Sequence, residues 1–319
     1  MNIFILFLII LLFIYALKNK ILLNYNEYFT TKKNYSFTEL LKSRRRLERL
    51  YGPKSHIKLK NNNITVIQKK YGGWFYVLVD SGNLGSKENS ELYAKMLQIP
   101  TIPNYYVGHI SKLNIPKHIN TFIIKPTNLN DSNGLLLIKN NICQTTNQKF
   151  NSNKEVIEFY KNKYSNLNFN VFCQKNISST IRPTEVYVFT FNGITSLFAL
   201  KNWKSVNQKE FSYYTPNLKL IQGNNTKIPD KIKSIISDSN KFSKLIKTFM
   251  RIDFLIDQNT GDYYFCETST YPWCGKSLGL NVDNRLKNYW KYCFPFNKGN
   301  LNDIYNDSLR WNKKEKCEK

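Results

Sequence analysis

Two short, mostly apolar runs that also carry charged residues lie near the C-terminal end of the chain, at residues 251–257 and 263–269. Both runs are rich in β-branched and aromatic residues, and a short Gly-containing connection separates them, so the pattern predicts a β-hairpin. Because side chains alternate along a strand, Arg251 and Asp253 should lie on one face. A tight hairpin should place Glu267 opposite Asp253.

The same kind of pattern predicts the other elements of the chain. We expect helices over residues 37–50, 86–97, 155–164 and 228–249, with Ser86 as the N-cap of the second. We expect strands within residues 58–79, 122–126, 135–138, 171–177, 185–191 and 196–201. Asn192-Gly193 should form a hairpin turn between the last two strands. No internal repeat is visible among these segments.

The N-terminal residues differ from the rest of the chain because they are almost entirely apolar. Residues 3–17 carry no charge, and Lys18 and Lys20 are followed by three more apolar residues. A cleaved signal peptide would carry positive charge before the run and small residues after it, and neither is present. Snorkelling lysines would let the run reach the length of a spanning helix. We therefore predict a single membrane anchor over residues 1–23.

Basic residues that follow the anchor set its expected orientation. Lys32, Lys33 and the arginines at 44–46 lie within residues 24–50, which we interpret as a basic linker with one helix. By the positive-inside rule, this segment should face the cytoplasm. The sequence therefore predicts a single-pass membrane protein whose main part is cytoplasmic.

The composition allows a large packed core and implies attraction to polyanions. The chain has 319 residues, of which 42% are hydrophobic, so two lobes or one large unit are expected. Lys and Arg outnumber Asp and Glu by 47 to 22, which gives a formal charge of +25. The lysines are spread along the chain, however, and no zinc-finger spacing or RNA-recognition motif accompanies them. We therefore expect no specific nucleic-acid partner.

The motifs of several other chemistries are missing from the sequence. The six cysteines form no CxxC pair, so buried free thiols in a reduced compartment are expected. His56, His109 and His118 form no cluster with acids or cysteines. Neither a GxSxG elbow nor a Walker-type phosphate loop is present. Serine hydrolases and P-loop enzymes are therefore disfavoured.

The facing carboxylates of Asp253 and Glu267 form a candidate metal site. Two carboxylates a few ångströms apart repel each other unless a cation lies between them. Mg²⁺ suits this position because it binds oxygen ligands and usually combines one or two carboxylates with substrate phosphates. The alternative is an ordinary surface hairpin whose acids are solvated.

Lys125 is a second candidate, because it ends an apolar strand that reads Ile-Ile-Lys-Pro. An ammonium group on a rigid strand can hold phosphate oxygens at a fixed distance. The alternative is a solvent-facing lysine, which is common in a chain with so many lysines.

In their order along the chain, these motifs resemble the ATP-grasp superfamily, in which two α+β lobes close on ATP. The resemblance covers roughly residues 86–275 and is closest to the TupA-like branch, which is linked to cell-wall polysaccharide synthesis. The chain also resembles D-alanine ligase and RimK-type ligases. The resemblance implies an α+β, ATP-grasp fold that follows the transmembrane helix and binds ATP and Mg²⁺. The implied units are an α/β subdomain (51–104), a small lobe (105–177), a large lobe with the metal site (178–300) and a charged tail (301–319).

The resemblance implies several residues for nucleotide binding. Lys87 matches the lysine that opens the first helix of the family, although Ser86 replaces the usual Asp. Lys125 matches the lysine that reaches the phosphates of ATP, and Lys201 lies where relatives often carry another. The loop 127–134, which would cover the phosphates, contains only one Gly and is the weakest match.

The region between the two lobes is expected to bind the nucleoside. Gln174, Lys175 and Ile177 fall at the hinge whose backbone would meet the adenine, and Gln174 replaces a Glu of the family. Glu185 matches an acidic residue near the ribose. These roles follow from the resemblance alone.

The predicted hairpin matches the Arg-x-Asp … Glu-x-Asn signature of the family. The resemblance implies that Asp253 and Glu267 hold Mg²⁺ between the β- and γ-phosphates, and that Arg251 stabilises an oxyanion. Ser269 stands where many relatives have Asn, so its metal contact should be weaker. Alternatively, Arg251 only pairs with Asp253 as a structural bridge.

The function that the resemblance implies is a membrane-tethered, ATP-dependent carboxylate–amine ligase that acts through an acyl phosphate. A glycan or cell-surface precursor would be the acceptor, which suits an enzyme held at a membrane. Two alternatives stay open: a phosphotransferase on the same fold, and a non-catalytic nucleotide-binding scaffold.

Overall fold

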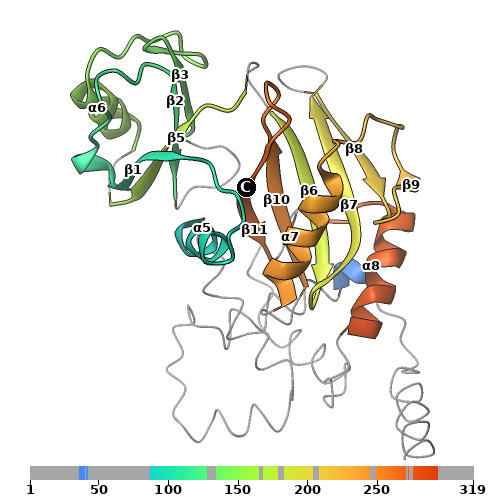
Figure 1. The fold of residues 1–319 in the computed structure, drawn as a ribbon. Helices are drawn as coiled ribbons and strands as arrows, with labels where there is room; N and C mark the ends of the chain where they lie inside the picture. The colour runs from blue at the N-terminus through green and yellow to red at the C-terminus, as the bar shows by residue number, and fades with distance from the viewer. Residues whose placement is uncertain are drawn as a thin grey trace, which may run out of the picture.

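The computed structural model contains two antiparallel β-sheets, each with its own hydrophobic core (Figure 1). It describes residues 36–39, 41, 87–127, 134–164, 168–178, 183–203, 208–244, 249–270, 272 and 276–293. The predicted anchor (1–23), the strands within 58–79, the cap Ser86 and the charged tail (301–319) lie outside the described residues. Within the described part of the chain, no helix is both long and apolar enough to cross a membrane.

The small lobe is a five-stranded sheet with one helix on its outer face (Figure 1). Its strands are β1 (Asn104–His109), β2 (Phe122–Pro126), β3 (Leu136–Lys139), β4 (Ile142–Cys143) and β5 (Asn170–Lys175), in the order β1-β5-β2-β3-β4. A 3₁₀ turn, η1 (Ile110–Lys112), follows β1, and helix α6 (Asn153–Lys163) precedes β5. The core between sheet and helix contains Ile124, Ile138, Val156, Tyr160 and Val171.

Helix α6 begins at Asn153, two residues before its predicted start, with Ser152 as its N-cap. The Ser152 hydroxyl accepts a hydrogen bond from the Glu155 backbone N–H at 3.3 Å, and the Glu155 carboxylate accepts one from the Asn151 backbone N–H at 2.9 Å. This reciprocal arrangement satisfies N–H groups that the first turn of a helix leaves unpaired.

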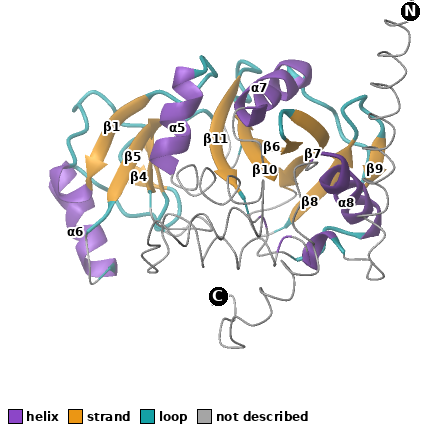
Figure 2. Cartoon of the chain, turned by 90° about the horizontal axis from the view of Figure 1, so that it is seen from below, coloured by secondary structure: helices purple, strands orange, loops and turns teal. Residues whose placement is uncertain are grey.

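The large lobe is a six-stranded sheet with helices on both faces (Figure 2). Its strands are β6 (Thr184–Phe191), β7 (Ile194–Trp203), β8 (Lys209–Tyr214), β9 (Leu220–Gln222), β10 (Phe249–Ile256) and β11 (Tyr263–Ser269), in the order β11-β10-β6-β7-β8-β9. Helix α7 (Ile232–Lys244) contacts β6, β7 and β10, while α8 (Leu280–Cys293) contacts β6, β7 and β9.

The two faces of the large sheet differ in chemistry. Val188, Phe198 and Ile252 point to one face, where they pack with Ile235 and Phe242 of α7 in a core of buried side chains. Alternation along the strands sends the residues between them to the opposite face, which carries most of the predicted site.

Helix α5 (Lys87–Met96) precedes the small lobe in the chain but packs against the large lobe (Figures 1 and 2). Ala94 and Ile99 belong to the large-lobe core, and the Tyr93 ring meets that of Phe242 edge to face at 4.8 Å. Just after the helix, the Pro100 carbonyl accepts a hydrogen bond from the Phe265 N–H of β11 at 2.7 Å.

Glu91 of α5 also ties this helix to the small lobe. Its carboxylate is buried and accepts hydrogen bonds from the Asn104 side chain of β1 at 2.5 Å and from that of Gln174 in β5 at 3.4 Å. Lys95 forms an ion pair with it at 2.7 Å. Helix α5 therefore contacts both lobes.

The structure confirms most of the predicted elements and corrects one. The helix predicted over 228–249 is shorter, Ile232–Lys244, because Phe249 already belongs to strand β10. Of the helix predicted over 37–50, the described residues 37–39 and 41 are helical. The sequence pattern did not predict β1, η1, β4, β8, β9 or α8.

Candidate active site

The predicted hairpin is formed by β10 and β11, and Asp253 does face Glu267 in its register. Near the turn, Ile256 pairs with Tyr263 and Phe254 with Phe265, and continuing this register would pair Asp253 with Cys266. A β-bulge between Asp253 and Phe254 shifts the pairing by one residue. The two carboxylates therefore face each other because of the bulge, which leaves Cys266 as its extra residue.

Arg251 and Asp253 form a buried, two-pronged ion pair on this face. The Arg251 Nε and Nη2 atoms donate to the two oxygens of Asp253 at 2.7 and 2.6 Å. The side chains are only 12% and 5% exposed, whereas Glu267, whose Oε1 lies 4.0 Å from Arg251 Nη2, is 35% exposed. Such a planar fork holds both groups in a fixed orientation.

Burial and charge act in opposite directions on this pair. Burial raises the pKa of the Asp253 carboxyl to about 7, although Arg251 opposes the shift. Burial alone would lower the pKa of the Arg251 guanidinium, but the carboxylate of Asp253 outweighs it and the pKa is raised. Asp253 thus lies in a place where an additional cation would favour its charged form.

A second bulge brings Glu185 and Lys201 together on the same face. The hairpin of β6 and β7 turns at Asn192-Gly193, and its register shifts by one residue between Phe189 and Thr190. Without that shift Glu185 would face Leu200; with it, Glu185 faces Lys201. The extra residue is Ser196, whose carbonyl accepts a hydrogen bond from Arg285 Nε of α8 at 2.7 Å.

Glu185, Tyr187 and Lys201 share a hydrogen-bond network. Lys201 Nζ lies 2.6 Å from Glu185 Oε1 and donates to the Tyr187 hydroxyl at 3.1 Å. The Tyr187 hydroxyl donates in turn to Glu185 Oε2 at 2.5 Å. Lys201, for which the resemblance implies a phosphate contact, is paired with Glu185 in the structure.

These polar side chains form a continuous line across β11, β10, β6 and β7, which we name the charged row. Its members are Glu267, Asp253, Arg251, Tyr187, Glu185 and Lys201. Asp253 is opposite Tyr187 in the register of β10 and β6, which joins the two halves of the row. In this line, anions and cations lie next to each other at distances of a few ångströms.

Lys125 of the small lobe approaches the charged row from the other sheet. Its Nζ lies 3.9 Å from Cys266 Sγ, at the bulge of β11, and 5.8 Å from the centre of the Phe172 ring. Burial alone would lower the pKa of the Lys125 ammonium, but nearby acidic groups raise it above its ordinary value. These groups are Cys266, Glu267, Glu91 and Asp253.

Lys87 and Gln174 lie beside Lys125 rather than in the row. Lys87 Nζ donates to the carbonyl of Pro126 at 3.3 Å, at the end of the strand that carries Lys125 and next to the loop 127–134. The Gln174 side chain is buried and donates to Asn104 at 3.0 Å. Residues 128–133 of the loop lie outside the described residues, so the structure leaves its predicted phosphate contacts as predictions.

The remaining predicted residues lie at the edges of this region. Lys175 ends β5 with an exposed side chain, and Ile177 is buried just after it, where the chain leaves the small lobe. Ser269 pairs with Arg251 in the register, two residues beyond Glu267 and hence on the same face of β11.

The donor atoms of this region fit a hard divalent cation. Asp253, Glu267 and Ser269 offer oxygen atoms on one face of the hairpin, which are the ligands that Mg²⁺ prefers. Both Asp253 oxygens are bonded to Arg251, so this carboxylate would have to release or share at least one of them. Within the described residues, no group of three or more His, Cys, Asp or Glu side chains could hold a metal ion.

Sequence reasoning missed three residues of this region: Tyr187, Cys266 and Arg285. Tyr187 lies two residues from Glu185, and strand alternation could have placed it on the same face. Cys266 is the extra residue of one bulge, and Arg285 binds the carbonyl of Ser196, the extra residue of the other. No local sequence pattern indicates where a bulge falls.

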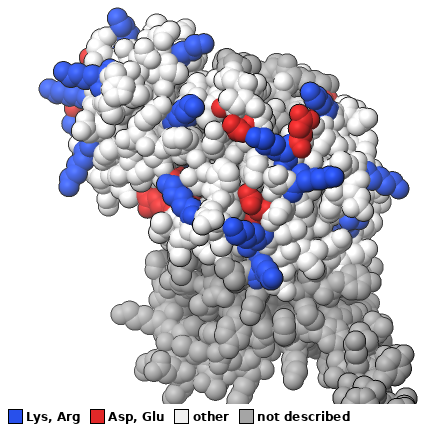
Figure 3. Space-filling model, in the orientation of Figure 1, with Lys and Arg blue, Asp and Glu red and all other residues white. Residues whose placement is uncertain are grey.

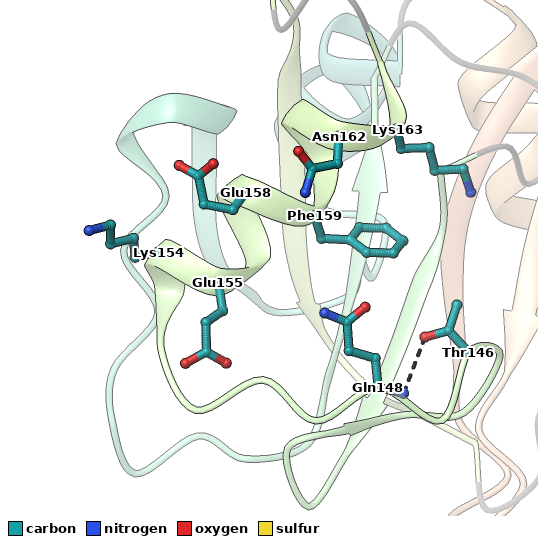
Figure 4. Close-up of a pocket in the computed structure, with 8 residues that line it drawn as sticks. All are labelled: Thr146, Gln148, Lys154, Glu155, Glu158, Phe159, Asn162 and Lys163. Atoms are coloured by element: carbon teal, nitrogen blue, oxygen red, sulfur yellow. Dashed lines mark hydrogen bonds between the residues drawn. The ribbon is translucent and has the colours of Figure 1, made fainter.

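A surface hollow lies elsewhere, along α6 of the small lobe (Figure 4). Its volume is about 680 Å³, and Phe159 and Gln148 face each other across it. It is lined by Thr146, Gln148, Lys154, Glu155, Glu158, Phe159, Asn162 and Lys163. None of the predicted site residues is among them, so the hollow is separate from the candidate active site.

On the face shown in Figure 3, Lys and Arg are distributed over both lobes rather than in a single patch. This distribution agrees with the even spread of lysines along the sequence. It gives a diffuse positive field that attracts anions without defining one docking position.

No family model and no curated protein sequence matches the chain. Several solved structures are similar to it. The D-alanine–D-alanine ligase of Bacillus anthracis, solved with ATP, is 15% identical with a TM-score of 0.44, over 73% of this chain and 68% of that one. The L-amino acid ligase of Bacillus licheniformis is 15% identical with a TM-score of 0.41, over 67% and 49%.

A third similar structure is the biotin carboxylase domain of the 2-oxoglutarate carboxylase of Hydrogenobacter thermophilus, solved with ADP, magnesium and bicarbonate. It is 17% identical with a TM-score of 0.45, over 71% of this chain and 51% of that one. At such identities and scores, these similarities do not assign the chain to a family or to an activity.

Proposed function

We propose that this chain is an ATP-dependent ligase of the ATP-grasp type, which joins a carboxylate to an amine and forms ADP and inorganic phosphate. The observation that supports it most is the position of Lys125, which projects from one sheet toward the acids of the charged row on the other. A cation and a carboxylate pair on opposite sides of an interface between two lobes suit a bound Mg²⁺-polyphosphate.

In this proposal, Lys125 and Lys87 bind the phosphates of ATP. Both ammonium groups lie near the C-terminal end of β2, and the loop that follows that strand would cover the nucleotide. Gln174, Lys175 and Ile177 form the chain segment between the lobes, which we assign to the adenine. Glu185 would accept a hydrogen bond from the ribose, while Lys201 holds its carboxylate in place.

Asp253, Glu267 and Ser269 would hold Mg²⁺. When bound, the ion would neutralise charge on the phosphates and fix their orientation. Arg251 would then turn at least one of its N–H groups from Asp253 toward the reacting carboxyl group.

The proposed reaction needs no covalent enzyme nucleophile. The substrate carboxylate attacks the γ-phosphorus of ATP and ADP leaves, which forms an acyl phosphate. The amine attacks the acyl carbon, phosphate leaves and the amine loses a proton, which completes the amide. Arg251 would stabilise the oxygen that becomes negative as the amine adds, and the two lobes would hold the reactants together.

Product analysis with the full-length chain tests the proposal directly. The protein is incubated with Mg²⁺-ATP and a pool of carboxylates and amines, and ADP, inorganic phosphate and phosphorylated products are measured. Equal amounts of ADP and phosphate, with a hydroxamate formed when hydroxylamine is added, support a ligase. Calorimetry that shows no binding of Mg²⁺-ATP would contradict the proposal, whereas binding without turnover would favour the non-catalytic nucleotide-binding scaffold.

One observation favours a phosphotransferase as a second candidate. Both oxygens of Asp253 are bonded to Arg251, as expected if this arginine only stabilises the hairpin. Transfer of phosphate to a hydroxyl group needs no residue that stabilises an acyl oxyanion. The product analysis distinguishes the two, because a kinase forms ADP and a stable phosphorylated product without releasing phosphate.

We further propose that a glycan or cell-surface precursor is the acceptor and that residues 1–23 anchor the protein to a membrane, with the remainder in the cytoplasm. The apolar N-terminal run and the basic residues after it support the anchor. Alkaline carbonate extraction of membranes tests it. Release of the intact protein into the soluble fraction would show that the anchor is wrong.

A further inference from the structure

Tyr187 lies at the centre of the charged row and contacts both of its halves. It is buried on β6, two residues from Glu185 in sequence and opposite Asp253 in the register with β10. Its hydroxyl is bonded to Glu185 and Lys201 on one side, and its ring lies against Arg251 on the other. The proposed function gives roles to each of these neighbours but none to Tyr187.

The ring of Tyr187 supports the guanidinium of Arg251. The Cζ atom of Arg251 lies 4.4 Å from the centre of the ring, while the Nε and Nη2 atoms bind Asp253. A guanidinium group is attracted to the face of an aromatic ring, and the attraction grows when water is excluded. If Arg251 turns from Asp253 toward a substrate, the ring therefore still limits where the guanidinium can go.

The hydroxyl of Tyr187 orients Glu185. It donates to Glu185 Oε2 and accepts from Lys201 Nζ, which itself binds Glu185 Oε1. The two oxygens of Glu185 are thus held by two different donors, which fixes the plane of the carboxylate. Hydrogen bonds to a charged group are stronger than those between neutral groups, so this orientation is firmly set.

We infer that Tyr187 is a positioning residue that acts through two neighbours: its hydroxyl sets Glu185 for the nucleotide, and its ring sets Arg251 for the reacting carboxyl group. This inference rests on the proposed function. It predicts that the two parts of one side chain affect two different kinetic constants, whereas a tyrosine that only fills space would affect neither.

Two substitutions separate the two parts, and a third is their control. Tyr187→Phe removes the hydroxyl but keeps the ring, and Tyr187→Leu removes both. Tyr213→Phe removes a hydroxyl from the same face of the sheet, on β8, where that group has no hydrogen bond to any other described residue. The measurements are kcat and KM for ATP with the full-length chain, the ATP affinity by calorimetry, and the melting temperature.

The expected results differ between the variants. Tyr187→Phe should raise KM and Kd for ATP about tenfold with little change in kcat, since a hydrogen bond to a charged group is lost. Tyr187→Leu should also lower kcat, by roughly ten- to a hundredfold, because Arg251 loses the surface that positions it. Tyr213→Phe should resemble the wild type.

Each other outcome has a definite meaning. If both Tyr187 variants lower the melting temperature but keep the wild-type constants, the residue only packs and the inference is wrong. If Tyr187→Phe lowers kcat as much as Tyr187→Leu, the division between hydroxyl and ring is wrong. If the wild-type chain itself neither binds nor consumes ATP, the proposed function has failed. The first two results are distinct from this one, because both require a wild-type chain that is active in the control assay.

Discussion

The two lobes contribute charge to the candidate site in different ways. On the large sheet, cations and anions of the charged row already neutralise each other, as Arg251 does with Asp253 and Lys201 with Glu185. On the small sheet, Lys125 lies beside apolar neighbours, Ile123 among them, and within the described residues it has no carboxylate partner at ion-pair distance. The large lobe therefore provides an ordered network, and the small lobe adds one positive charge that a ligand can use.

This difference has a mechanical consequence. A network of short bonds resists movement of its members relative to one another, whereas one lysine that meets its neighbour at 3.9 Å can move away without breaking a network. Closure of the small lobe over a nucleotide would therefore change the surroundings of Lys125 more than those of the charged row.

Replacement of Lys125 should have the largest effect. Lys125→Met keeps a side chain of similar length but removes the charge, so we expect kcat/KM for ATP to fall on the order of a thousandfold. Lys139→Met is the control, because Lys139 is an exposed lysine at the end of the neighbouring strand β3. A loss of similar size in both variants would mean that general positive charge, rather than the position of Lys125, attracts the nucleotide.

Arg251→Ala should lower turnover about a hundredfold while ATP affinity stays close to wild type, since this residue is expected to act on the oxygen that becomes negative. Formation of the acyl phosphate, measured by trapping with hydroxylamine, should persist. Asp253→Asn should weaken ATP binding and both partial reactions together. If the two variants lose every activity in parallel, and Arg251→Ala also lowers the melting temperature, the pair is a structural bridge.

The attachment of the small lobe through α5 can be tested with Glu91→Gln. The neutral amide is a weaker acceptor for the side chains of Asn104 and Gln174, so we expect a loss of about 1–2 kcal/mol in the free energy of unfolding. Lys95→Met removes only the exposed partner of Glu91 and should cost a few tenths of a kcal/mol, about the contribution of a helix-surface ion pair. Equal losses in both variants would show that α5 does not depend on the bonds to the small lobe.

The smallest effect concerns Cys266, which reports how closely Lys125 approaches. Burial raises the pKa of its thiol to about 12, so at pH 8 the thiol is almost entirely protonated and alkylation is slow. Lys125→Met should slow alkylation by iodoacetamide a further few-fold, because the ammonium lowers this pKa, and Glu267→Gln should speed it. Peptide mass spectrometry follows the reaction, with the buried Cys173 as an internal reference. Faster alkylation in Lys125→Met would mean that the lysine shields the thiol instead.

Sequence reasoning predicted the parts of the fold that have strong local patterns. The strand that ends in Lys125, the helix at Lys87 and the hairpin turn at Asn192-Gly193 were found because apolar periodicity and turn residues coincide there. Strand β8 was missed because Lys209, Glu210 and Ser212 interrupt its apolar positions. Helix α7 was predicted too long, since the apolar run into Phe249 continues in a strand.

The candidate site was predictable only in part, for reasons of register. Alternation placed Arg251 and Asp253 on one face, and the predicted hairpin placed Glu267 opposite Asp253. The pairing of Glu185 with Lys201 depends on a single extra residue, Ser196, and a shift of one residue exchanges the faces of a whole strand. The approach of Lys125 depends on how the two lobes sit together, which no local pattern contains.

The position of α5 also sets an order for folding during synthesis. The core of the small lobe lies between Ile110 and Cys173, so this lobe can close as soon as its last strand leaves the ribosome. Helix α5 is made earlier, yet its partners Phe242 of α7 and Phe265 of β11 are among the last parts of the large lobe's core to be translated. The growing chain must therefore keep the apolar side of α5 uncovered for most of its synthesis, and this is where we expect a chaperone to bind the nascent protein.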